Sequence, residues 1–395
     1  MQTTPAPQSL VNWDLAAATA ARLSTAGPRF TRRQALKEAD GLRWAADASV
    51  EHVHRLTGLD AARDLRDSEV LVVDRPTWAQ ANVQAFSTLL TPAFGHLRQT
   101  RPEEFARAST ALGTTATGVE AGTVLAFMAS KVLGQYEPFC ALPGPDGTAP
   151  GPEGGRLLLV APNIAEVRVE LNVDPEDFRL WVCLHEQTHR VQFAAAPWLR
   201  EHLRTEITAL VSGMFDKAET LPDRLTSGLR SLAGSARSGT SPRHQVPDDG
   251  PLPAASGSGD AEVPSASMGL LDLIQDPEDK ARLSHLTAVM SLLEGHANVV
   301  MDGIDSSVVP TVKTIRQRFD HRSAHRSALD RWMRRLMGMD AKMRQYRDGQ
   351  RFVKHAVQQM GMDAFNIVWD GPEHLPTETE LHHPQQWVER MRGRS

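Results

Sequence analysis

The sequence predicts a mainly α-helical fold with a small β-sheet. Apolar residues recur at three- and four-residue spacing along most of the chain, which is typical of amphipathic helices. Only three short segments, at residues 69–73, 156–160 and 165–171, favour strands. Hydrophobic residues make up 41% of the chain and charged residues 23%, which are ordinary fractions for a globular protein with a substantial core.

The helical pattern divides into several segments before residue 220. The expected helices cover residues 11–23, 31–56, 78–90, 115–134 and 198–215. Asp74 is placed to cap the third of them, with Pro76 in its first turn. The fourth is rich in Ala, Gly and Thr, so we expect a packing helix that its neighbours approach closely.

The strand at 165–171 is predicted from alternation, because Val167, Val169 and Leu171 are separated by charged residues. We expect Glu166–Leu171 to be an edge strand beside the helix described next, where a substrate backbone can add as another strand. A hairpin that only covers the core is the alternative interpretation.

The most informative stretch is His185-Glu186-Gln187-Thr188-His189, an HExxH motif. Asp174 and Pro175 indicate that a helix begins about three turns earlier. On that helix His185 and His189 are four residues apart, so both imidazoles project to the same side and can share one metal ion. Glu186 lies beside them, where its carboxylate can take a proton from a metal-bound water.

A catalytic zinc ion needs a third protein ligand, and Glu294 is the best candidate. It lies on the apolar stripe of a helix that Asp276 and Pro277 begin, and a buried carboxylate is costly unless a cation compensates it. Asn298, one turn later, is placed to orient it. His296 is the rival ligand, although it projects about 200° around the helix from Glu294.

These segments carry a family resemblance. HEQTHRVQF, SLLEGHANVVMDGI and VNWDLAAATAARL resemble a bacterial zincin-like family of hydrolases or zinc-dependent metalloproteases, some of them labelled as associated with deazaflavin-coenzyme biosynthesis. The resemblance implies a zincin-like metalloprotease fold and a gluzincin-like site. In that site His185, His189 and Glu294 would bind Zn²⁺ and Glu186 would be the general base.

A further catalytic candidate is Tyr346, in a Y-x-x-G-x-x-F-V pattern that also occurs in the resembled family. Zinc peptidases usually place a side-chain donor opposite the metal to stabilise the developing oxyanion. His355, His325 and Arg351 compete for this role, and ordinary helix packing is the other interpretation of Tyr346.

The chain divides into five parts. Residues 1–8 are expected to be a disordered tail, 9–230 an N-terminal helical part with the sheet and the HExxH helix, and 231–267 a disordered insertion rich in Gly, Pro and Ser. Residues 268–371 form a C-terminal helical part with the third ligand, and 372–395 a C-terminal tail.

Charge and cysteine content limit the partners. The net charge of −5 disfavours general nucleic-acid binding, although residues 313–354 hold thirteen Lys or Arg against four Asp, a local charge of +9. The two cysteines are too few for a disulfide framework, and no signal peptide or membrane-spanning segment is predicted, which favours a cytoplasmic protein. We expect Cys183 to be a small buried hydrophobic residue facing away from the metal.

The expected activity is zinc-dependent hydrolysis of a peptide or a small amide. Three alternatives remain open on the sequence: a zinc-bearing binding or scaffold protein with little protease activity, a hydrolase of non-peptide amides, and a nucleic-acid binder that uses residues 313–354. The motif defines a reaction type, whereas substrate choice depends on the shape of the surrounding pocket.

Overall fold

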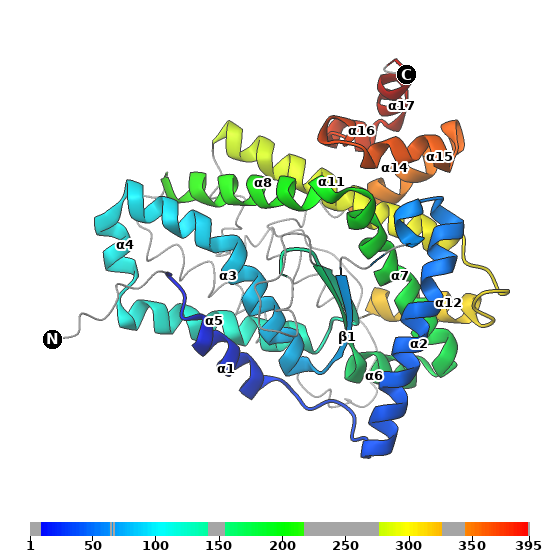
Figure 1. The fold of residues 1–395 in the computed structure, drawn as a ribbon, viewed down its shortest axis with the longest axis horizontal. Coiled ribbons are helices and arrows are strands. Elements are labelled where there is room, and N and C mark those ends of the chain that lie inside the picture. Colours follow the sequence, from blue (N-terminus) through cyan, green and yellow to red (C-terminus); the bar gives the residue numbers. More distant parts are fainter. Residues whose placement is uncertain are drawn as a thin grey trace, which may run out of the picture.

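The computed structural model describes residues 9–63, 65, 68–140, 155–216, 276–325 and 344–393. Within them the chain is mainly helical with one three-stranded sheet near its centre, which confirms the predicted fold class (Figure 1). The predicted N-terminal tail, the insertion at 231–267 and the middle of the basic stretch lie outside the described residues.

The sheet has the order β1-β3-β2. Strands β1 (Ser68–Val73) and β3 (Gly155–Val160) are parallel, and Ser68 pairs with Gly155. Strand β2 (Gly134–Glu137) is antiparallel to β3, with Gly134 opposite Leu159. The strands expected at 69–73 and 156–160 are therefore present.

The central strand β3 is buried on both faces. Leu157 and Leu159 belong to the main apolar core, which α2 and α7 also line, whereas Leu158 and Val160 pack with Trp78 into a second apolar cluster. Because successive side chains of a strand point to opposite faces, β3 joins the two clusters, and β1 does the same through Val72 on one face and Val73 on the other.

Five helices are built from the N-terminal half of the described chain. They are α1 (Trp13–Leu23), α2 (Arg32–Thr57), α3 (Arg75–Thr100), α4 (Pro102–Ala108) and α5 (Ala111–Ala129). Thr31 and Gln34 form a reciprocal capping box at the start of α2, and Asp74 caps α3 as predicted. Helix α3 is longer than expected because Pro92 lies within it without ending it.

The strand predicted at 165–171 is wrong. These residues belong to helix α6 (Ala161–Leu171), whose buried positions include Ile164, Val167 and Leu171, at helical spacing. Val169, which completed the apparent alternation, is 64% exposed. Pro162 lies in the first turn and Asn172 ends the helix in the left-handed conformation, so both ends carry helix signals that the alternation concealed.

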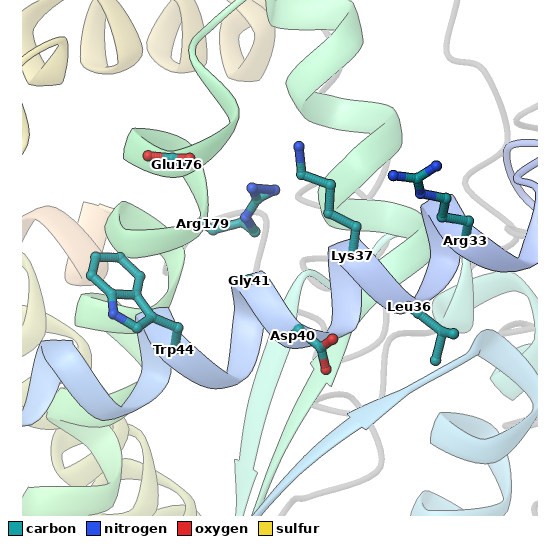
Figure 2. Close-up of a pocket in the computed structure, with 8 residues that line it drawn as sticks. All are labelled: Arg33, Leu36, Lys37, Asp40, Gly41, Trp44, Glu176 and Arg179. Carbon is teal, nitrogen blue, oxygen red and sulfur yellow. The ribbon is translucent and has the colours of Figure 1, made fainter.

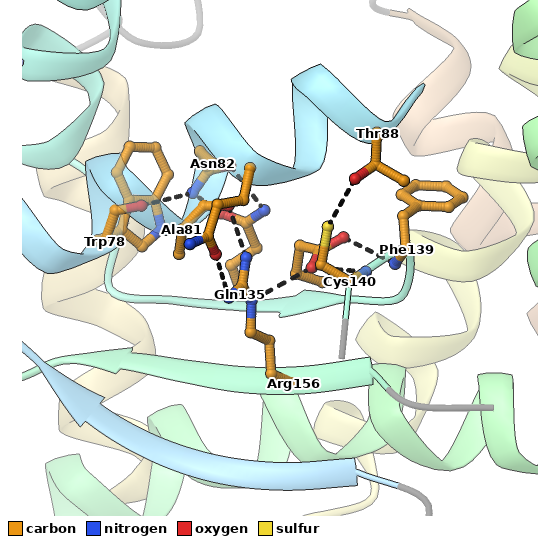
Figure 3. A network of polar contacts seen from close by, with 10 residues as sticks. Trp78, Ala81, Asn82, Thr88, Gln135, Phe139, Cys140 and Arg156 are labelled. Carbon is orange, nitrogen blue, oxygen red and sulfur yellow. Dashed lines mark hydrogen bonds and ion pairs between the residues drawn. The ribbon is translucent and has the colours of Figure 1, made fainter. Parts of the chain in front are cut away.

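The edge strand beside the HExxH helix is therefore β2 and not Glu166–Leu171. A polar network holds it to α3 (Figure 3). Asn82 and Gln135 exchange side-chain hydrogen bonds of 3.2 and 3.0 Å, and the buried Arg156 donates to Ala81 O at 2.6 Å. The Arg156 Nε atom lies 3.3 Å from a Glu137 carboxylate oxygen. These contacts fix β2 against the rest of the sheet.

The two helices predicted to carry the site begin where their caps indicate. The Asp174 and Asp276 side chains accept backbone N–H groups at the starts of α7 (Pro175–Ala195) and α11 (Pro277–Asp302). Helix α8 (Pro197–Asp216) follows α7 and packs against α11 (Figure 1).

The C-terminal part contains α12 (Val312–His325), α14 (Arg344–Met360) and α15 (Met362–Phe365). The residues from 372 onward, expected as a tail, include α16 (Glu378–His382) and α17 (Pro384–Arg392), which pack on α14. No helix in the described part of the chain is long and apolar enough to cross a membrane.

The backbones of α11 and α14 are in direct contact at two glycines, Gly295 and Gly349. A Cβ atom on Gly295 would lie 2.3 Å from the backbone carbon of Gly349, and one on Gly349 would lie 2.1 Å from Ser291 O. Backbones can approach this closely only where neither residue has a side chain. Gly295 follows Glu294 directly, so this contact also sets the position of the proposed third ligand.

We expect Gly295→Ala to lower the free energy of unfolding by about 2 kcal/mol or more, since overpacking against backbone cannot relax by a side-chain rotation. Gly95→Ala is the matched control, because a Cβ there meets nothing within 4 Å. It should be neutral or stabilising by up to about 1 kcal/mol. Urea denaturation of both variants measures the difference, and equal stabilities would contradict the proposed contact.

Candidate metal centre

The HExxH residues occupy the middle of α7. His185 and His189 lie one turn apart, and their ring centroids are 4.9 Å apart at 89°. Both rings therefore project from the same face of the helix, where two imidazole nitrogens can approach one ion.

Glu294 of α11 faces both histidines. Its carboxylate oxygens lie 3.6 Å from His189 Nε2 and 3.9 Å from His185 Nε2. One ligand atom from each of these three residues lies within 4.8 Å of the other two, and no other group of three His, Cys, Asp or Glu meets that criterion among the described residues.

The geometry of this trio fits a zinc ion. Tetrahedral zinc with nitrogen and oxygen ligands at 2.0–2.2 Å holds those ligand atoms about 3.4 Å apart. The observed separations of 3.6 and 3.9 Å are close to that value but too long for hydrogen bonds. The Glu294 side chain is 32% exposed, and its carboxylate accepts no hydrogen bond within the described part of the chain, so both oxygens are available to a cation.

Glu186 is buried beside the trio, with 8% of its surface exposed. Its side chain packs on β2, since a Cβ atom on Gly134 would lie 2.6 Å from Glu186 Cγ. Burial raises the pKa of Glu186 to about 7, and the nearby Glu294 charge acts in the same direction while His189 opposes it. A carboxylate with a pKa near neutrality can both accept and return a proton.

Gln192 connects His189 to α11, and the sequence interpretation missed it. Its Oε1 lies 3.0 Å from His189 Nδ1, while its Nε2 donates to Leu293 O at 2.9 Å and lies 2.9 Å from His296 Nδ1. The amide oxygen is placed to accept an Nδ1 proton of His189, which would leave Nε2 available to a metal ion. The available signal was a buried amide three residues after the second histidine, on the same helix face.

His296, the rival ligand, lies away from the trio. It is fully buried, and its ring stacks on Phe365 at 5.9 Å and meets Trp369 edge-on. Burial lowers the pKa of His296 to about 3, so the ring is neutral and accepts from Gln192. Asn298 was expected to orient Glu294, but within the described residues it makes no hydrogen bond to that carboxylate. The polar side chain that contacts a residue of the trio is Gln192, and the residue it contacts is His189.

The face of α7 opposite the two histidines packs along α2, and the contacting residue pairs all have the same separation in sequence. Gln187 donates to Ala46 O at 2.7 Å, Cys183 Sγ lies 3.8 Å from Leu42 O, and Arg179 bonds Glu38 at 2.9 Å. Each pair is 141 positions apart, as parallel helices in fixed register require. Cys183 is buried as expected, and burial raises the pKa of its thiol.

Arg190 follows the motif directly, and its charge is accommodated by polar partners near β1. It is 7% exposed and donates to Ser68 Oγ at 2.6 Å and to Leu65 O at 2.5 Å. The charge therefore ties α7 to the start of β1 on the side away from the trio.

The structure does not show any of the candidate oxyanion donors beside the trio among the side chains that it describes. Arg351 pairs with Asp348 at 3.0 Å, and His355 lies 3.2 Å from the Gln385 side chain, so both are engaged with α14 or the C-terminal helices. Tyr346 lies in the first turn of α14, and its side chain is outside the description, as is that of His325.

A surface cavity of about 580 Å³ lies elsewhere, between α2 and the first turns of α7 (Figure 2). Lys37, Trp44 and Arg179 are among its lining residues, and none of the trio or Glu186 is. This cavity is therefore separate from the candidate metal centre, which is identified by the distances between its three ligand atoms.

A model of the zincin-like metallopeptidase family matches residues 11–388, which include both helices of the site. The chain belongs to this family. Membership confirms the resemblance found in the sequence and supports a metal-dependent hydrolase. The zincin-like match spans nearly the whole chain, so it covers the sheet and the C-terminal helices as well as the motif.

A similar solved structure is described as "a putative hydrolase with a novel fold" from Chloroflexus aurantiacus. The two chains are 28% identical, with a TM-score of 0.62, and the match covers 96% of this zincin-like chain and 98% of the other. No curated protein matches.

We expect Gln192→Leu to weaken zinc binding about 10- to 100-fold, since the proton acceptor that orients His189 is lost. Gln187→Leu is the matched control on the same helix, because Gln187 bonds α2 and not a histidine. It should reduce stability while leaving zinc affinity within about twofold, a change worth well under 1 kcal/mol. Competition with a chromophoric chelator measures both, and equal losses would refute the orienting role.

Proposed function

We propose that this protein is a zinc-dependent hydrolase that cleaves peptide bonds. The convergence of His185, His189 and Glu294 beside a buried carboxylate carries this proposal. Family membership supports the hydrolytic chemistry, and the donor set of two imidazoles and one carboxylate is the one zinc peptidases use.

His185, His189 and Glu294 would hold the ion, and the fourth position would remain open to water and substrate. Burial lowers the pKa of His185, so the ring is neutral and offers its lone pair near pH 7. Zn²⁺ bound there would lower the pKa of a coordinated water and polarise the substrate carbonyl.

Glu186 then acts on protons. Its carboxylate takes a proton from the attacking water and transfers it to the leaving amine when the carbon–nitrogen bond breaks. Contact with Gly134 on one side limits the movement of this carboxylate, so it stays beside the reacting atoms. Proton acceptance and proton return by one fixed group is the pattern that HExxH enzymes require.

The position of β2 favours a peptide as substrate. In the described part of the chain β2 pairs on one side only, with β3, and its Gly134 contacts Glu186. An extended peptide can add to such an edge through backbone hydrogen bonds, which would place its scissile bond near the trio. The Arg156 and Asn82 contacts keep this edge in register with the site.

Tyr346 is the proposed oxyanion donor. Gly349, one turn later on α14, contacts α11 at Ser291 and Gly295, so α14 begins close to the helix that carries Glu294. Arg351 and His355, its described competitors, have other partners.

Glu186→Gln should keep zinc at wild-type stoichiometry while lowering kcat about 10²- to 10⁴-fold, because the amide cannot accept the proton. Zinc content and turnover of a peptide library, with small amides alongside, are the measurements. Unchanged turnover in the variant would refute the role of Glu186. A zinc-loaded wild type that cleaves no peptide would refute the peptidase proposal, and cleavage of small amides alone would identify the non-peptide alternative.

Tyr346→Phe should lower kcat about 10²- to 10³-fold with little change in KM, as expected for a donor that acts only in the transition state. Tyr136→Phe is the control, since Tyr136 is the only other tyrosine and packs on Phe193 at 5.3 Å. Steady-state kinetics of both variants decide the assignment. A loss shared equally by the two variants would contradict it.

A further inference from the structure

Two histidines outside the trio meet between α8 and α11. The Nε2 atoms of His202 and His285 lie 2.7 Å apart, and their rings are perpendicular with centroids 5.0 Å apart. Both residues are half-buried, and the family chemistry described above uses neither. Figure 1 shows α8 and α11 running alongside each other over one side of the molecule.

An ion pair next to the two histidines also joins α8 and α11. Glu206, one turn after His202, accepts from Arg282 at 3.0 Å, and Arg282 lies almost one turn before His285. Arg282 also bonds Glu278 at 2.9 Å. The Glu206 charge favours protonation of both histidines, but burial, the larger effect, lowers the pKa of each. Near pH 7 both rings are therefore neutral and keep their lone pairs.

Two neutral imidazoles whose Nε2 atoms point at one another have two ways to stabilise that arrangement. One ring can donate its Nε2 hydrogen to the other, which uses both nitrogens and leaves no metal site. Alternatively both nitrogens can bind one ion, which would separate them to about 3.4 Å for tetrahedral zinc. The second arrangement needs a separation only about 0.7 Å greater, within reach of small side-chain rotations.

Glu206 is a candidate third ligand beside the two histidines, and its charge acts on both of them. It lies on the same face of α8 as His202, four residues later, and it is bonded to an arginine with a second carboxylate partner. With Glu206 held by Arg282, the ligand atoms of His202, His285 and Glu206 do not all lie within 4.8 Å of one another, so the site forms only when Glu206 turns toward the imidazoles. Arg282 keeps Glu278 as its partner when that happens. Two imidazoles and one carboxylate are a zinc ligand set, and water can complete it.

We propose that His202, His285 and Glu206 form a second zinc site that clamps α8 to α11. Helix α8 continues from the HExxH helix α7, and α11 carries Glu294. An ion at this position joins the two chain segments that supply the two halves of the candidate metal centre. The expected effect of the ion is on stability, because its ligands would come from two packed helices and no substrate-binding element is involved.

Zinc stoichiometry after equilibrium dialysis at free zinc up to about 100 µM tests the proposal. Wild type should bind two equivalents, whereas His202→Asn and His285→Asn should each bind one. Glu294→Ala should also bind one, and His202→Asn combined with Glu294→Ala should bind none. His96→Asn is the matched control, because His96 is a more exposed histidine paired with Asp216, and it should keep two.

Thermal unfolding gives a second measurement that does not depend on activity. In the Glu294→Ala background, which isolates the second site, Tm should rise with zinc concentration, and adding His202→Asn should remove the rise. Glu206→Gln preserves both imidazoles and should weaken this zinc response about tenfold or more.

The proposal is overturned if wild type binds a single equivalent over this range, because the histidines would then form only a hydrogen bond. It is also overturned if the second equivalent survives His202→Asn and His285→Asn. Failure of the candidate metal centre has a different signature, since Glu294→Ala would then leave zinc content unchanged.

Discussion

The contact between α7 and α11 is the constraint on which the candidate metal centre depends. His189 and Glu294 are 105 positions apart, yet their ligand atoms lie 3.6 Å from each other. Gln192 spans this contact, since it binds the His189 ring on its own helix and Leu293 O beside Glu294 on the other. One amide therefore contacts a candidate ligand and also joins the two helices that supply the candidate ligand set.

The surroundings of α7 make this contact rigid. Its outer face is held in register along α2, and Arg190 joins it to the start of β1. Gly295 and Gly349 bring α14 against α11 directly after Glu294. With neighbours fixed on these sides, the three candidate ligands are held in place by the protein itself, which would reduce the free energy spent on ordering the site when an ion binds.

Burial gives Glu186 the property that its proposed chemistry needs. The carboxylate has little water around it and one close neighbour of the same charge, Glu294, and both effects raise its pKa. A cation among the three ligands would act in the opposite direction by favouring the charged carboxylate. The balance between burial and ion charge would then set the pH range in which Glu186 can accept a proton.

Prediction from the sequence succeeded where the signal is local. It failed where one segment fits both the two-residue period of a strand and the 3.6-residue period of a helix. The caps at Asp174 and Asp276 were predicted and are present, because a capping side chain bonds backbone within three residues. Residues 165–171 carry an alternating pattern and also a helical one. Packing of Ile164, Val167 and Leu171 into the core decided for the helix, so the predicted edge strand lies instead in β2.

The amino-acid sequence was sufficient to predict the helical class, the family and the spacing that puts His185 and His189 on one face, since these depend on residues within a few turns of each other. It also identified Glu294 as a carboxylate on an apolar stripe, which needs compensation wherever the helix packs. The three-dimensional fold was needed to show that α11 packs on α7 near that residue, that Gln192 joins these helices and that His202 meets His285. Such contacts depend on how close two helices come. That distance is set by residues far apart in the chain, here by glycines that allow backbones to approach and by buried amides that bond across the gap.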